Sequence, residues 1–188
     1  GNVEKREANV EKREAKPVQR ERHDHVPAVV EMCASKPNDS WTPPEPLPEV
    51  EGTSFYSLGL SNPILHGVHD IGFAQCTEIQ ARVLPEALKM RDIAGKAQTG
   101  TGKTAAFLIS AFDYFLKNPL LEPTAGNPRC LIIAPTRELA VQIGQDARDL
   151  GKYCDAKVVT VFGGMDYEKQ AAEFQGRVDI VVATPGRL

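Results

Sequence analysis

Blocks of apolar residues alternate with amphipathic stretches from Phe55 onward, and this pattern predicts helices and strands in turn. Asn62-Pro63 predicts the start of a short helix, because proline is favoured at the first helical position. Thr77 and Gln80 have the T-x-x-Q spacing of a capping box, which predicts the start of the next helix. Apolar residues with helical spacing predict three further helices, at 102–118, 136–153 and 166–175.

Four short segments between or after these helices predict strands, at 92–97, 130–135, 157–162 and 179–185. The run CLIIAP at 130–135 is apolar throughout, which is typical of a parallel strand buried on both faces. Strand–helix–strand alternation at this spacing predicts an α/β fold, a parallel sheet flanked by helices.

The first 54 residues have a different composition and predict a disordered N-terminal extension with a linker. Residues 2–8 read NVEKREA and are repeated at 9–15, and prolines punctuate the stretch from Pro17 to Pro48. Such a charged, proline-rich stretch forms neither a central strand nor a stable helix. We expect two parts, an extension over 1–54 and a partial domain over 55–188.

Charge and cysteine content narrow the function classes. The extension contains 8 basic and 11 acidic residues and the domain 14 of each, so the net charge of −3 belongs to the extension. The domain therefore has no overall basic field, and any nucleic-acid binding must come from local contacts. Four scattered cysteines indicate reduced thiols. With no apolar run of membrane-spanning length, we expect a cytoplasmic protein with no membrane partner.

AQTGTGKT at 97–104 carries the strongest chemical signal in the chain. It follows a predicted strand and opens a predicted helix, the context of a phosphate-binding loop. Gly100 and Gly102 let backbone N–H groups turn toward phosphates. Lys103 supplies a positive charge and Thr104 a hydroxyl for Mg²⁺. Ala97 stands where the usual pattern has glycine. Alanine can keep this turn if the φ of Ala97 is negative. A chance glycine-rich turn is the alternative.

Three further strings follow the later predicted strands: APTRELA at 134–140, Gly163-Gly164, and ATPGRL at 183–188. Open parallel sheets place their ligand sites at the carboxyl ends of the strands. Each string offers a helix start, a glycine turn or an arginine, which suit phosphate groups better than base edges. Helix capping is the alternative for the threonines, and a structural ion pair for the arginines.

The chain resembles the DEAD-box ATP-dependent RNA helicases over residues 55–188, in the order of FxxLGLSNPILHGVHDIGFAQCTEIQ, AQTGTGKT, PTRELA, GG and TPGRL. AQTGTGKTAAFLIS, VFGGMDYEKQ and GFAQCT look most like the bacterial subgroup associated with RNA-degrading assemblies. The resemblance implies a RecA-like P-loop NTPase domain that uses ATP and Mg²⁺ and binds RNA through its backbone.

The resemblance also assigns roles to residues. Gln80 would read the adenine edge and Phe55 would stack on the base, with packing of the linker onto the domain as the alternative for Phe55. The predicted catalytic residues are Lys103 and Thr104, with Thr104 also a metal ligand. The predicted nucleotide-binding set is Phe55, Thr77, Gln80, Ala97, Gln98, Thr99, Gly100, Thr101, Gly102, Lys103 and Thr104. The predicted RNA-binding set is Pro135, Thr136, Arg137, Gly163, Gly164, Thr184, Pro185, Gly186 and Arg187.

Two departures from the family pattern change what we expect. Glu78 replaces the proline of the usual P-T-P-I-Q and places a carboxylate near the nucleotide. No D-E-A-D sequence occurs, and in the family it lies downstream of T-P-G-R-L. We therefore expect a truncated helicase that binds ATP but does not hydrolyse it alone. A non-catalytic binding module is the rival interpretation.

Overall fold

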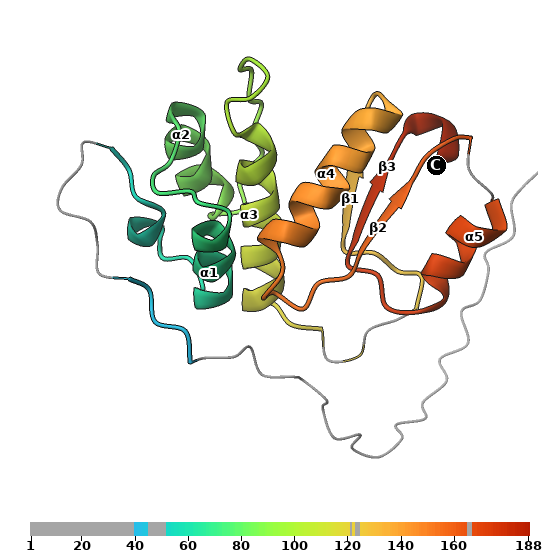
Figure 1. Ribbon diagram of the computed structural model, residues 1–188, viewed down its shortest axis with the longest axis horizontal. Helices are drawn as coiled ribbons and strands as arrows, with labels where there is room; N and C mark the ends of the chain where they lie inside the picture. The colour runs from blue at the N-terminus through green and yellow to red at the C-terminus, as the bar shows by residue number, and fades with distance from the viewer. Residues whose placement is uncertain (1–39, 45–51, 121, 123–124, 165–166) are drawn as a thin grey trace, which may run out of the picture. The chain divides into compact units, whose positions relative to one another are not determined.

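The computed structural model describes residues 40–44, 52–120, 122, 125–164 and 167–188, all within the unit Ala34–Leu188 (Figure 1). Most of the predicted N-terminal extension lies outside these residues. The domain boundary predicted at residue 54 therefore stays a prediction.

The first helices form where local signals predict them. A 3-10 helix, η1, spans Phe55–Leu58, and the Ser54 side chain accepts a hydrogen bond from the N–H of Tyr56 at 3.2 Å. α1 spans Asn62–Asp70 with proline in its first turn, and α2 spans Glu78–Ala87 behind a complete capping box. The sequence predictions of these two helix starts are confirmed.

The remaining helices also follow the predicted pattern. α3 covers Lys103–Lys117 directly after the glycine-rich loop. α4 covers Arg137–Leu150, and the Thr136 hydroxyl caps it by accepting from the N–H of Leu139 at 3.3 Å. The predicted helix at 166–175 divides into two elements, α5 at Tyr167–Ala172 and the 3-10 helix η2 at Glu173–Gln175. A further 3-10 helix, η3, spans Pro185–Arg187 after the last strand.

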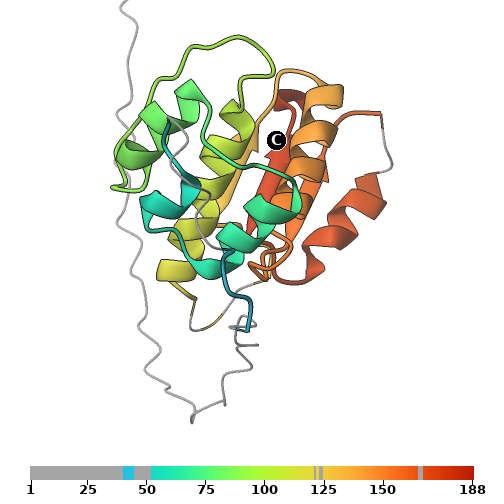
Figure 2. The same ribbon diagram turned by 60° about the vertical axis from the view of Figure 1, so that its left-hand side comes forward.

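Three parallel strands form the sheet, in the order β1-β3-β2. β1 is Cys130–Ile133, β2 is Val158–Val161 and β3 is Ile180–Ala183. In this register Ile133 and Val161 both lie opposite Ala183, so all three strands end at the same level. Figures 1 and 2 show these ends on the upper side of the sheet, where α3 and α4 also begin. A parallel sheet flanked by helices is confirmed.

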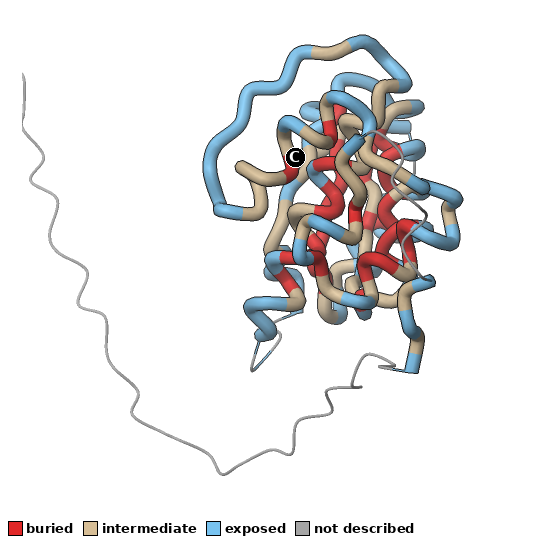
Figure 3. Tube along the Cα trace, turned by 90° about the vertical axis from the view of Figure 1, so that its left-hand side faces the viewer, coloured by how far each residue is buried: buried red, intermediate tan, exposed pale blue. Residues whose placement is uncertain are grey.

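The predicted strand at 92–97 is wrong. These residues form no regular secondary structure, and they are exposed apart from Ala97. A β-strand is stabilised by ladder hydrogen bonds to a neighbour, and the described sheet ends at β1. Figure 3 shows the segment between α2 and α3 as a long exposed arc, drawn pale blue.

The prediction that β1 is buried on both faces is also wrong. Leu131 is 51 % exposed and Ile133 is 58 % exposed, while the alternate residues of the strand are half-buried. The apolar core covers only the face of β1 that carries Cys130 and Ile132, and the face that carries Leu131 and Ile133 remains open. The central strand β3 shows the predicted pattern instead, because all four of its residues are buried.

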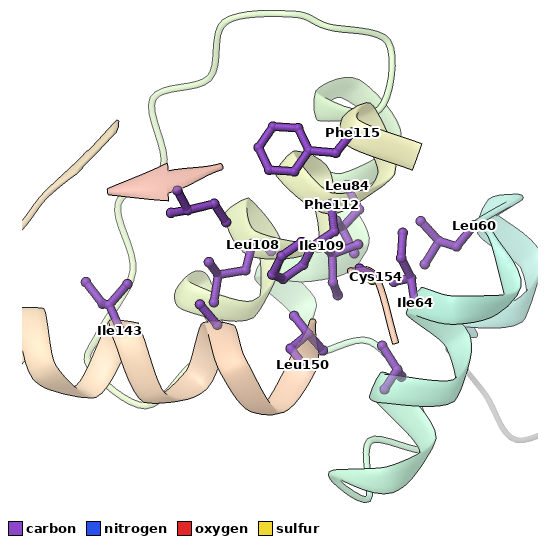
Figure 4. Close-up of a cluster of buried hydrophobic side chains, with 14 of the residues drawn as sticks. Leu60, Ile64, Leu84, Leu108, Ile109, Phe112, Phe115, Ile143, Leu150 and Cys154 are labelled. Atoms are coloured by element: carbon purple, nitrogen blue, oxygen red, sulfur yellow. The ribbon is translucent and has the colours of Figure 1, made fainter. Parts of the chain in front are cut away.

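Two apolar clusters lie on opposite faces of the sheet. The larger joins η1 and helices α1 to α4 to Ile180 and Val182 of β3 (Figure 4). The smaller contains Val181 and Ala183, which point to the other face toward Phe174 of η2. Alternate residues of β3 therefore supply both cores, as the two-residue period of a strand requires.

Candidate nucleotide and phosphate-binding site

The glycine-rich loop begins the site. Gly100 and Gly102 have φ of 83° and 88°, a left-handed conformation that only glycine adopts readily. Ala97 is not among the residues with positive φ; in the described chain the non-glycine residues of that kind are Met90 and Asp155. The condition under which alanine can replace the usual glycine is therefore met.

The Lys103 ammonium lies inside this loop. Its Nζ donates hydrogen bonds to the carbonyl oxygens of Ala97 and Gln98, each at 2.5 Å. The Thr101 hydroxyl donates to the same Gln98 carbonyl at 2.8 Å. The loop thus closes around one positive charge, at the first residue of α3, where helix N–H groups and the helix dipole also favour anions.

The capping box of α2 also holds the phosphate loop. The Gln80 Oε1 accepts from the Thr77 N–H at 2.9 Å, and Gln80 Nε2 donates to the Gly102 carbonyl at 3.1 Å. The Thr77 hydroxyl accepts from the Gln80 N–H at 3.4 Å and donates to the Thr101 carbonyl at 2.8 Å. Gln80 is 1 % exposed. The sequence predicted the cap but not these bonds across 22 and 24 residues.

The structure places Phe55 in the core. Its side chain is fully buried, and its ring lies parallel to that of Phe73 with centroids 6.2 Å apart. Packing onto the domain was the alternative that the sequence left open for Phe55. Stacking on a base would require this ring to become accessible, because burial leaves no face open to a ligand in this conformation.

A pocket of about 400 Å³ lies between α2 and the phosphate loop, a size suited to part of a small ligand. Glu78, Arg82 and Lys96 line it together with Thr77 and Ala97. Glu78 and Arg82 form an exposed ion pair at 3.6 Å, one helical turn apart. The carboxylate that replaces the family proline thus lies at this pocket, with a cation beside it.

The first strand-end segment carries Thr136 and Arg137. The Thr136 hydroxyl caps α4, so the capping alternative describes its contact in this structure. Arg137 enters no ion pair within the described chain, and its guanidinium lies 4.7 Å from the ring centroid of Phe162. Phe162 immediately precedes the Gly163-Gly164 turn and was missed by the sequence predictions; its place beside that turn was the available signal.

The other two segments lie beside the first. A Cβ added at Gly164, whose φ is 86°, would come within 3.6 Å of the Arg137 guanidinium, so the turn after β2 passes close to the start of α4. The Thr184 N–H donates to the Val161 carbonyl at 3.2 Å, which joins the ends of β3 and β2. The Arg187 guanidinium lies 5.9 Å from the ring of Tyr167, at the start of α5. The parallel register therefore brings the predicted RNA-binding segments together.

Thiols and metal ligands add little to this site. Cys76, Cys130 and Cys154 are free, and burial raises the pKa of Cys76, just before Thr77, to about 11. No group of three or more histidine, cysteine, aspartate or glutamate residues in the described part could hold a metal ion. Among the described helices, none is both long and apolar enough to cross a bilayer.

Comparison with known proteins gives a consistent answer. A family model described as DEAD/DEAH box helicase matches residues 77–188. The ATP-dependent RNA helicases RhlB of Pseudomonas syringae and of Pseudomonas aeruginosa are each 52 % identical over 143 residues, which is 75 % of this chain and 36 % of theirs. The chain thus spans about a third of the length of these relatives.

Solved structures agree. A DEAD box protein from Methanococcus jannaschii is 34 % identical, with a TM-score of 0.62 over 73 % of this chain and 36 % of that one. The RNA helicase Prp28 from Chaetomium thermophilum bound to ADP is 39 % identical, with a TM-score of 0.61 over 76 % and 33 %. The family model, the relatives and the solved structures agree with the phosphate loop and the strand-end segments described above. The chain therefore belongs to the DEAD/DEAH box helicase family.

Proposed function

We propose that this chain binds ATP with Mg²⁺ and holds one strand of RNA by its backbone, as part of an ATP-dependent RNA helicase. The observation that supports the proposal is the common location of two features that are suited to binding anions. The phosphate loop with Lys103 and the three strand-end segments with Arg137 and Arg187 lie on the upper side of the domain in Figures 1 and 2.

The triphosphate would bind at the phosphate loop. Lys103 now donates to two carbonyl oxygens of its own loop. Phosphate oxygens would be stronger acceptors for the same donor, because hydrogen bonds between two charged groups are shorter and stronger than neutral ones. Thr104, next along α3, would offer its hydroxyl to Mg²⁺, which typically keeps waters and phosphate oxygens as its other ligands. Bound Mg²⁺ neutralises charge on the phosphates.

Gln80 is proposed to read adenine while it holds the loop. Its amide oxygen has a second lone pair and its amide nitrogen a second hydrogen beyond those used on Thr77 and Gly102. One donor and one acceptor are what the N6 and N7 edge of adenine requires. Because Gln80 is buried, this contact needs a small opening between α2 and the loop. Base binding would then be transmitted directly to the phosphate loop.

Strand separation coupled to ATP hydrolysis is proposed for the whole protein. This chain matches about a third of the length of its relatives. The RNA contacts proposed here use arginine and backbone groups, which position phosphates without reading sequence. We also propose a role in an RNA-degradation assembly, on the resemblance of AQTGTGKTAAFLIS and VFGGMDYEKQ to that bacterial subgroup. We propose a cytoplasmic location as well, because the relatives that match the chain are bacterial RNA helicases.

Competition between ATP and GTP for the chain tests the proposal. Lys103→Ala should weaken both nucleotides alike, by about 10- to 100-fold, because it removes a charged phosphate contact. Gln80→Ala should chiefly remove the preference for adenine. Lys89→Ala is the matched control, because this exposed lysine lies two residues after α2 and forms an ion pair with Glu86 at 3.0 Å. It should leave both affinities unchanged.

Equal losses of ATP and GTP on Gln80→Ala would contradict the adenine contact and leave Gln80 as a support of the loop. Unchanged ATP binding by the Lys103 variant would contradict the nucleotide site itself. The rival, a non-catalytic binding module, predicts that the full-length protein shows no RNA-stimulated ATP turnover. Turnover that requires Lys103 would exclude that rival.

A further inference from the structure

The chain contains one tryptophan, Trp41, and it lies in a stack of three rings. The Trp41 ring is stacked on His66 of α1 with centroids 4.6 Å apart and planes 9° apart. His66 is in turn stacked on Tyr153 at 3.6 Å and 3°. Among the described ring contacts, Trp41 and Tyr153 do not meet, so they cover opposite faces of the imidazole.

Helix packing alone brings two of these rings together. Gly67, the neighbour of His66, approaches the end of α4 so closely that a Cβ there would overlap the backbone of Leu150. Tyr153 follows α4 by three residues and therefore reaches the His66 ring. The surface of His66 and Tyr153 is thus built by α1 and α4, independently of the segment that carries Trp41.

Charged side chains lie beside the imidazole of His66. The Asp70 carboxylate accepts from the Tyr153 hydroxyl at 2.6 Å and from Lys152 Nζ at 3.2 Å. Asp70 also lies 3.7 Å from His66 Nε2 and 3.7 Å from His69 Nδ1. The hydrogen bond from Tyr153, followed by the nearby Lys152, lowers the pKa of Asp70, so it is ionised throughout the neutral range. The described residues 40–44 bring no charged side chain.

We propose that the His66–Tyr153 surface is the docking site for the segment 40–44 of the chain's own N-terminal extension, anchored by Trp41 and tightened when His66 is protonated. A neutral imidazole between two rings gains stacking alone. An imidazolium adds an attraction to the faces of both rings and to Asp70. Lys152 and His69 share that carboxylate and reduce the gain without removing it. Histidine is the side chain that changes charge between about pH 5 and 8.

The docking site lies near the end of α4, and the start of the same helix belongs to the proposed RNA site. α4 begins at Arg137, which is proposed to hold RNA, and ends at Leu150, close to the docking site. The two ends of a 14-residue helix are about 20 Å apart. Anchoring at Trp41 therefore places the segment 40–44 near the end of α4 that lies away from the proposed RNA site.

Tryptophan fluorescence tests the proposal directly, because Trp41 is the single tryptophan of the chain. Acrylamide quenching of the full 188-residue chain is measured at pH 8 and pH 5.5, with helix content checked by circular dichroism. We expect Trp41 to be shielded at both values, and about two- to five-fold less open to quencher at pH 5.5. His66→Ala should expose Trp41 at both values.

His66→Phe keeps a flat ring between Trp41 and Tyr153 but cannot be protonated. This variant should stay shielded and lose the pH response, and it remains informative if His66→Ala does not fold. The double variant His23→Gln/His25→Gln is the matched control and should keep the response of the unaltered chain. A Trp41 that is as open in the unaltered chain as in His66→Ala would overturn the docking. A pH response that persists in His66→Phe would overturn the role of His66.

Discussion

The two halves of the domain reach the same side of the molecule by different means. The sheet half, residues 130–188, is held by parallel ladders in which β3 pairs along its length with β1 and β2. The phosphate-loop half, 77–117, has no strand in the described chain, and side chains of the α2 cap hold its loop. Between the halves lies an apolar hollow of about 890 Å³, lined by Phe107, Leu108 and Ile133 among others.

This difference shows that the phosphate loop can adopt its conformation although the segment before it is not paired as a strand. The hydrogen bonds of the loop come from residues within seven positions of Lys103 and from the nearby helix start of α2. A strand, in contrast, depends on a neighbour supplied by a distant part of the chain. The loop should therefore keep its local shape while the segment before it contributes little to stability.

Truncating one isoleucine in each half should produce the largest contrast. Ile180→Ala removes a fully buried side chain at the start of the central strand β3 and should lower the free energy of unfolding by about 2–5 kcal/mol. Ile93→Ala, in the segment predicted as a strand and 41 % exposed, should change it by less than about 0.5 kcal/mol. Urea unfolding midpoints of both variants measure this. Equal losses would mean that residues 92–97 form a buried strand in solution.

A glycine substitution should separate loop shape from sheet stability. Gly102→Ala places a Cβ against the Gln80 amide at a φ of 88°, which costs about 1–2 kcal/mol. We expect ATP affinity to fall about 5- to 30-fold, while amide hydrogen exchange of β3 stays unchanged. Gly176→Ala is the control, because the added Cβ would have open space around it among the described residues and the φ of −114° suits any residue. Faster exchange in β3 would contradict the independence of the two halves.

Loss of one arginine should have a smaller effect, confined to the sheet half. Each phosphate neutralised on a single strand contributes about 0.7 to the salt slope of binding. Arg137→Gln should reduce the slope for single-stranded RNA by about that amount, equally for unrelated sequences, and leave ATP affinity unaltered. Titrations at several salt concentrations with two unrelated RNA sequences measure it. An effect that depended on sequence would be inconsistent with a backbone contact.

Thiol ionisation should change stability only at alkaline pH. Burial, followed by the charge of Asp113, raises the pKa of Cys154 from 9.0 to about 12. The folded state therefore keeps this thiol neutral, and its contribution is complete below pH 9.0 and is lost as the pH rises toward 12. Stability measured from pH 8 to 10.5 should fall less steeply in Cys154→Ala. Alkylation at pH 8 should be slow in the folded chain, since the thiolate is the reactive form.

Much of the candidate site could be predicted from short stretches of sequence. The glycines at 100 and 102, the Thr77–Gln80 cap and the start of α4 at Thr136 each depend on a few adjacent residues. The three apolar runs that became strands were also found, because β-branched residues cluster in them. The runs at 92–97 and 130–135 were both predicted to be strands, yet the first is unpaired and the second contains an edge strand with exposed side chains.

Local chemistry, then, was determined by the sequence: the turn, the cap, the positive charge at the loop and the family to which they belong. Only the tertiary structure decided which apolar residues are covered. Phe55 is buried in the core and Ile133 is exposed. Trp41 stacks on His66, which stacks on Tyr153 where the ends of α1 and α4 pack together. Hydrogen bonds within a turn need only neighbouring atoms, whereas burial and strand pairing depend on surfaces that distant segments bring together.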